Sequence, residues 1–237
     1  MAKNVLKIAF IFIFGMAGGI FADQIFWPYF VERPLFYEYR LDRPPIYVAE
    51  TKEVIIRENA ALTNAVANVS RVVAGVRTQT AAGRVLEGSG LVVTSDGLMV
   101  TLAELVPAGS VFNFSIDGQA LGFQVLRRDL TNNLALVRLE GANFDTVGFA
   151  DFGQLLLGER VFLVGNTHDQ KGSKLAAEGI VRALGEDSLQ TTIFEQTLAS
   201  GSPLFNIEGR VLGLVSVASS GRVSAIPITK IRAFLGF

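Results

Sequence analysis

The sequence predicts an all-β domain that follows an N-terminal membrane segment. From Val72 onward the chain consists of short runs rich in β-branched and aromatic residues, separated by Gly, Asp and Asn. Several short strands at such spacing favour a closed or sandwiched β architecture. The eight runs cover residues 72–79, 88–102, 110–129, 134–141, 160–167, 177–184, 210–217 and 223–228.

Two Asp-Gly dipeptides, Asp96-Gly97 and Asp117-Gly118, lie between alternating apolar stretches. Both residues of a tight two-residue hairpin turn often need a positive φ, which Asp tolerates and Gly favours. These two positions therefore predict β-hairpins.

The N-terminal segment, residues 1–30, is predicted to be a membrane anchor. Its run Ile8–Ala22 is apolar and uncharged, with Lys3 and Lys7 before it and Asp23 after it. Lys7 can snorkel, so the apolar stretch reaches about 17 residues, the minimum for a span. The preceding lysines predict a cytoplasmic N-terminus and a body outside the cytoplasmic membrane, either periplasmic or extracellular. Cleavage as a signal peptide is the alternative.

Residues 31–53 contain three prolines and mixed charges without a sustained period, which predicts a linker. Residues 54–71 then carry apolar side chains at helical spacing around Leu62, Val66 and Val69. We expect a short helix that leads into the β domain.

The composition excludes several classes of function. With 21 basic and 22 acidic residues, the chain offers no broad positive field for nucleic acid. Cysteine is absent, which excludes disulfides, thiol nucleophiles and thiolate metal sites. His168 is the only histidine, and no carboxylates cluster at ligand spacing, so we expect neither a metal nor a cofactor.

Three separated segments, in order, resemble the trypsin-like serine proteases of the bacterial HtrA type. The first, GSGLVVTSDGLMVT, is similar to the hairpin that leads to the catalytic histidine, and the second, RDLTNNLALVR, to the strand that carries the aspartate. The third, QTTIFEQTLASGSPLFN, is similar to the loop of the nucleophile. These segments cover residues 88–101, 128–138 and 190–206, and shorter matches lie at 164–166, 178–181, 209–215 and 225–227.

The resemblance implies a trypsin-like double β-barrel over residues 72–237, with lobes of about 72–147 and 148–237. It places Ser200 at the nucleophile, Glu104 at the histidine and Asn133 at the aspartate. The PDZ domain common in the HtrA type has no counterpart up to residue 237.

Two of the three triad positions therefore lack the residues that the family uses for catalysis. A serine hydroxyl needs a neighbouring base, and that base needs an orienting group. A glutamate side chain in water has a pKa of about 4.3, far from what deprotonating serine at neutral pH requires, and the amide of Asn133 cannot stabilise an imidazolium. His168 follows a strand of the second lobe, whereas the family's histidine comes from the first, and we interpret it as a surface-loop residue.

The oxyanion hole also departs from the family pattern. In the family its donors are the N–H groups of the serine and of a glycine two residues earlier. Leu198 stands at that glycine, and Ser202 replaces the second glycine after the nucleophile. Glycine reaches backbone angles that are strained for leucine, so we expect the loop to lack the donor geometry.

The sequence therefore favours a membrane-anchored, catalytically inactive protease homologue that binds a protein or extended peptide in the cleft between its lobes. The alternative is a weak or unconventional serine endopeptidase that uses Ser200 with Glu104 or another base. Oligomerisation is left open.

Overall fold

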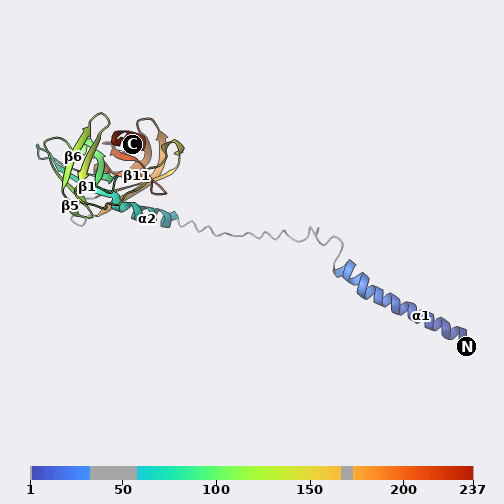
Figure 1. The fold of residues 1–237 in the computed structure, drawn as a ribbon. Helices are drawn as coiled ribbons and strands as arrows, with labels where there is room; N and C mark the ends of the chain where they lie inside the picture. The colour runs from blue at the N-terminus through green and yellow to red at the C-terminus, as the bar shows by residue number, and fades with distance from the viewer. Residues whose placement is uncertain (1, 33–57, 167–172, 237) are drawn as a thin grey trace. The chain divides into compact units, whose positions relative to one another are not determined.

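The computed structural model describes residues 2–32, 58–166 and 173–236. The chain divides into two compact units, Met1–Ile55 and Ile56–Phe237. We call the second unit the barrel unit. Figure 1 shows the N-terminal helix of the first unit and the strands of the barrel unit. The predicted linker and His168 lie outside the described residues.

The first unit contains a long apolar helix. Helix α1 (Ala2–Phe21) continues as the π-helical segment η1 (Ala22–Glu32). A stretch of 25 residues, Lys3–Trp27, includes an 18-residue segment with a mean hydropathy of 2.2. At 1.5 Å per residue it is about 37 Å long, enough to cross a hydrocarbon core of about 30 Å. The helix exceeds the predicted apolar run at both ends, because its backbone hydrogen bonds continue past the flanking charges.

The barrel unit begins with helix α2 (Glu58–Val69) and a 3₁₀ turn, η3 (Ser70–Val72). A seven-stranded antiparallel sheet follows in the order β5-β4-β1-β2-β3-β7-β6. Its strands are β1 (Val73–Gln79), β2 (Val85–Val92), β3 (Leu98–Leu102), β4 (Val111–Ile116), β5 (Gln119–Leu121), β6 (Phe123–Asp129) and β7 (Leu134–Leu139).

Aromatic side chains close this curled sheet. Strands β4 and β6 do not pair, yet the ring of Phe123 on β6 lies 4.7 Å from Phe114 and 6.1 Å from Phe112 on β4. Phe114 is fully buried. Aromatic pairs at such distances add to the stabilisation that burial alone provides.

The remaining strands form a closed six-stranded barrel in the order β10-β13-β12-β11-β8-β9. They are β8 (Arg160–Asn166), β9 (Lys174–Leu184), β10 (Leu189–Phe194), β11 (Pro203–Asn206), β12 (Val211–Val217) and β13 (Arg222–Pro227), followed by helix α3 (Ile228–Leu235).

Two apolar cores support the two sheets. One contains the first sheet and extends through Phe162 and Phe205, whose rings stack at 5.4 Å, to Ile231 of α3. The other fills the closed barrel. The shared core keeps the two sheets packed together.

The predicted fold class, a double β-barrel behind one N-terminal apolar helix, is confirmed. Asp117 and Gly118 adopt φ values of 49° and 80°, as the hairpin prediction requires. The first sheet remains open between β5 and β6 among the described strands, whereas the second closes completely. Helix α3 had no counterpart in the prediction.

Candidate active-site cleft

The loop that precedes Ser200 coils into a 3₁₀ turn. In η6 (Thr197–Ala199) the backbone N–H of Ser200 donates to the Thr197 carbonyl oxygen at 2.9 Å. Leu198 is not among the described residues with positive φ. Ser200 is 5% exposed. The Ser200 amide is thus directed into its own loop rather than towards the surface of the cleft.

Backbone bonds join this loop to the first sheet. The N–H of Ser89 in β2 donates to the Ser200 carbonyl oxygen at 2.9 Å. The Ser89 carbonyl oxygen accepts from Thr101 Oγ1 at 2.6 Å, and Ser89 Oγ accepts from the Asn166 N–H at 2.9 Å. Ser89 therefore links β2 with β3, with β8 and with the loop of Ser200.

The glycines around Ser89 permit this close approach. A Cβ at Gly88 would lie 2.5 Å from the Ser200 carbonyl oxygen, and a Cβ at Gly201 would lie 2.2 Å from the Ser89 carbonyl oxygen. Gly201 also adopts a φ of 77°. Both positions require glycine for steric reasons that are independent of catalysis.

Asn133 holds the segment that carries Glu104. Strand β3 ends at Leu102, and the 3₁₀ turn η4 (Ala103–Leu105) follows. Asn133, at a φ of 54°, accepts from the Glu104 N–H through Oδ1 at 3.0 Å and from the Ala103 N–H through its carbonyl oxygen at 3.1 Å. Asparagine suits this left-handed conformation better than most residues.

The structure brings the three positions together. Glu104 and Ser200 line one cavity of about 320 Å³, and Asn133 bonds the backbone of Glu104. The Glu104 side chain is exposed and makes no hydrogen bond or ion pair within the described residues. The full lining is Arg84, Val85, Leu86, Glu87, Glu104, Leu105, Thr197, Ser200 and Val217.

A second cavity extends the first into a groove. It has a volume of about 470 Å³ and shares Val85, Glu87 and Thr197 with the first. Arg77, Gln196 and Leu198 complete its lining. Leu198 thus lines the groove, although its backbone belongs to the coiled turn.

Two unpaired strand edges border this groove. Strand β2 pairs with β1 from Val85 to Leu91 but with β3 only at Gly90–Val92. Strand alternation directs the backbone groups of Val85 and Glu87 to the same side as those of Ser89, which bond the loop of Ser200. Sequence patterns had not identified these edge residues, because pairing partners are set by the three-dimensional fold.

The second edge belongs to β12. Val215 exchanges backbone hydrogen bonds with Gly201 and Ser202. By the same alternation, the backbone groups of Val217 face the side occupied by Ser200, and Val217 lines the cavity. The groove therefore has strand backbone on both sides.

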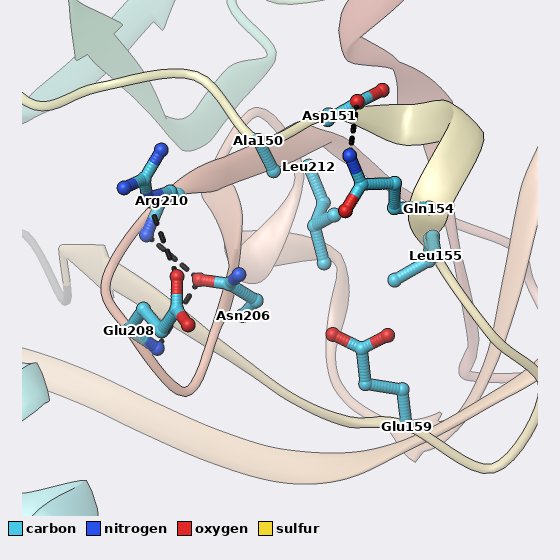
Figure 2. Close-up of a pocket in the computed structure, with 9 residues that line it drawn as sticks. All are labelled: Ala150, Asp151, Gln154, Leu155, Glu159, Asn206, Glu208, Arg210 and Leu212. Carbon is cyan, nitrogen blue, oxygen red and sulfur yellow. Dashed lines mark hydrogen bonds and ion pairs between the residues drawn. The ribbon is translucent and has the colours of Figure 1, made fainter.

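A further cavity, of about 360 Å³, lies in the second barrel and shares no lining residue with the groove (Figure 2). Its polar groups largely bond one another. Asp151 accepts from the Gly153 N–H and from Gln154 Nε2, and Arg210 lies 3.3 Å from Glu208. Among the described residues no group of three or more His, Cys, Asp or Glu side chains is placed to hold a metal ion.

Comparison with known proteins identifies the family. The family model of the trypsin-like peptidase domain matches residues 88–214. The chain is 30% identical over 123 residues to "Probable periplasmic serine endoprotease DegP-like" of Chlamydia muridarum, which covers 48% of this chain and 24% of that protein.

Two other relatives give the same result. "Serine protease Do-like HtrB" of Bacillus subtilis is 30% identical over 118 residues, which are 44% of this chain and 26% of that protein. A DegP-like protein of Rhizobium meliloti is 32% identical over 120 residues, 46% of this chain and 23% of that protein. The match thus spans about a quarter of each relative. The chain belongs to the trypsin-like peptidase domain family and is similar to its HtrA-type serine proteases.

Proposed function

We propose that the barrel unit is a catalytically inactive protease homologue that binds an extended peptide in the groove beside Ser200. Inactivity is supported by one observation above all: the Ser200 N–H donates to the Thr197 carbonyl oxygen. A donor already bonded within its own loop does not stabilise an oxyanion on a substrate. Glu104 at the histidine position and Asn133 at the aspartate position agree with this, since neither supplies the base and orienter of the family.

Peptide binding is supported by the two strand edges. An extended peptide can add to an exposed edge through main-chain hydrogen bonds, while side-chain pockets provide selectivity. Val85 and Glu87 on one side and Val217 on the other offer such backbone groups beside one cavity. This mode of binding requires no chemistry at Ser200.

We also propose that the N-terminal helix anchors the protein in the cytoplasmic membrane with the barrel unit outside the cytoplasm. The 25-residue apolar helix has the necessary length, and Lys3 and Lys7 lie on its N-terminal side. The names of two relatives, from Chlamydia muridarum and Rhizobium meliloti, both describe a periplasmic, DegP-like protein. A periplasmic domain fits both observations.

A fluorophosphonate probe tests inactivity directly, because it labels only an activated serine. Full-length protein in detergent is incubated with the probe, and its intact mass is measured beside that of Ser200→Ala. We expect no labelling in either. Stoichiometric labelling that is lost in Ser200→Ala would instead assign a weak serine hydrolase, for which Glu104 in the same cavity is a candidate base.

A further inference from the structure

We infer that the groove selects peptides carrying a lysine or arginine, whose cation lies on the Glu104 carboxylate. This inference rests on the proposed peptide-binding function and deepens it. It assigns to Glu104 a recognition role at the position where catalytic relatives carry a base.

The position of Glu104 is fixed while its charge remains available. Asn133 holds the backbone of Glu104 through its side-chain oxygen at 3.0 Å, so the carboxylate projects from an ordered turn. That carboxylate is exposed and has no ion-pair partner within the part of the chain that the structure describes. Because the turn is already ordered, binding of a counter-charge costs conformational freedom only in the Glu104 side chain and not in its backbone.

The walls around Glu104 suit the stem of a basic side chain. Leu86, Leu105 and Val217 line the same cavity of about 320 Å³. Lysine and arginine bury their methylene stems against apolar surface and keep the cation at a polar end. A shorter or purely apolar side chain would contact these apolar walls without forming an ion pair with the Glu104 carboxylate.

The other charges of the groove leave this assignment intact. Glu87 lies 3.4 Å from Arg77 across the β1–β2 pair and is therefore compensated. Arg84 is exposed and lines the same cavity as Glu104, but the two side chains form no ion pair within the described residues. Its positive charge opposes a second basic residue in the cavity, so the favoured peptide carries one basic side chain rather than a polybasic run.

The net charge of the chain strengthens the argument. At a formal charge of −1 the protein provides no general attraction for cations, so a preference for a basic residue must come from a local group. Such a preference weakens with salt, because an exposed pair is screened.

The experiment uses full-length protein in detergent and fluorescein-labelled decapeptide pools. One central position is fixed as Lys, Arg, norleucine, Gln or Glu, all other positions are randomised, and binding is followed by anisotropy at low and high ionic strength. Glu104→Gln removes the charge and preserves the shape. Glu186→Gln is the matched control, because Glu186 is also an exposed carboxylate but lies outside the groove.

We expect the wild type to bind the Lys and Arg pools about fivefold more tightly than the norleucine pool, as an exposed ion pair allows. Glu104→Gln should abolish that preference, Glu104→Lys should shift it to the Glu pool, and Glu186→Gln should retain it. Equal binding of all pools by the wild type, or an unchanged preference in Glu104→Gln, overturns the inference and leaves the peptide groove standing. Binding of no pool overturns the proposed function as well.

Discussion

The N–H of Ser89 donates to the carbonyl oxygen of Ser200 at 2.9 Å, which ties the first sheet to the loop at the nucleophile position. Only backbone atoms of Ser200 take part in this bond. The bond therefore does not involve the hydroxyl, and it gives this loop a structural role that is independent of catalysis.

The close contact at this joint predicts a large effect of Gly201→Ala. A Cβ there would lie 2.2 Å from the Ser89 carbonyl oxygen, and the φ of 77° adds strain. We expect the free energy of unfolding in urea to fall by about 3 kcal/mol or more. Gly109→Ala is the control, since its φ is 76° but no atom lies within 4 Å of the added Cβ. It should cost about 1 kcal/mol. Equal losses in both variants would refute the steric argument.

Asn133 is predicted to stabilise the fold through its side chain and its backbone conformation. Asn133→Ala loses the bond to the Glu104 N–H and places alanine at a φ of 54°, so we expect a loss of about 2 kcal/mol. Asn133→Gly loses the bond but accommodates the φ, and should lose about 1 kcal/mol. Urea denaturation of both variants separates the two contributions. Alanine and glycine variants of equal stability would show that the left-handed conformation is not costly here.

Asp129 should contribute to acid sensitivity. Hydrogen bonds from the Asn132 side chain and from the Asn132 and Thr131 N–H groups lower the pKa of this carboxyl in the folded protein. Because the folded pKa lies below the unfolded one, the contribution is present above about pH 4 and is lost as the pH falls through the folded pKa.

The measurement is the melting temperature as a function of pH. Asp129→Asn should flatten its fall below about pH 4 relative to the wild type. Asp145→Asn is the control. Asp145 is also an exposed carboxylate, but it has only a 3.8 Å ion pair with Arg71 and, within the described residues, none of the hydrogen bonds that Asp129 accepts. A wild-type slope in Asp129→Asn would contradict the assignment.

Restoring the triad alone should not restore proteolysis. Glu104→His with Asn133→Asp supplies a base and its orienter, but the Ser200 N–H still donates to the Thr197 carbonyl oxygen. A missing oxyanion donor costs about 3 kcal/mol, roughly a hundredfold in rate. We expect casein hydrolysis only after Leu198→Gly, with or without Ser202→Gly, is added. Hydrolysis by the double variant would show that the loop rearranges without glycine.

The orientation in the membrane can be tested with C-terminal fusions. Because Lys3 and Lys7 precede the apolar helix, alkaline phosphatase fused after Phe237 should be active and a cytoplasm-dependent fluorescent reporter should be dark. Exchanging both lysines for glutamate should weaken this bias. A fusion that works only in the cytoplasm would refute the proposed topology.

Local sequence signals indicated most of the strands and the Asp117-Gly118 turn, but β10 (Leu189–Phe194) and β11 (Pro203–Asn206) lie outside the eight predicted runs. The Asp117-Gly118 turn follows directly from two residues that tolerate positive φ. Helix α3 was missed because it has only eight residues and no side-chain cap, and its apolar contacts are tertiary.

The site was only partly accessible from sequence. Resemblance brought Glu104, Asn133 and Ser200 to one place, but the coiling of Thr197–Ala199 depends on hydrogen bonds that no residue pattern encodes. Likewise, Val85 lies on an unpaired edge because the shorter strand β3 pairs with β2 only at Gly90–Val92. This becomes visible only when the two strands are placed together in the sheet.

The phenylalanine seam of the first sheet has a consequence for motion. Between β4 and β6 the rings of Phe112, Phe114 and Phe123 take the place of a hydrogen-bonded ladder, and β5 passes to β6 through Gly122 alone. No backbone hydrogen bonds join β4 to β6, so this side can open without breaking a strand pair. Amide protons along the outer edge of β6 should then exchange with deuterium well before those of the closed second barrel. The first barrel would therefore be the one that opens locally more often.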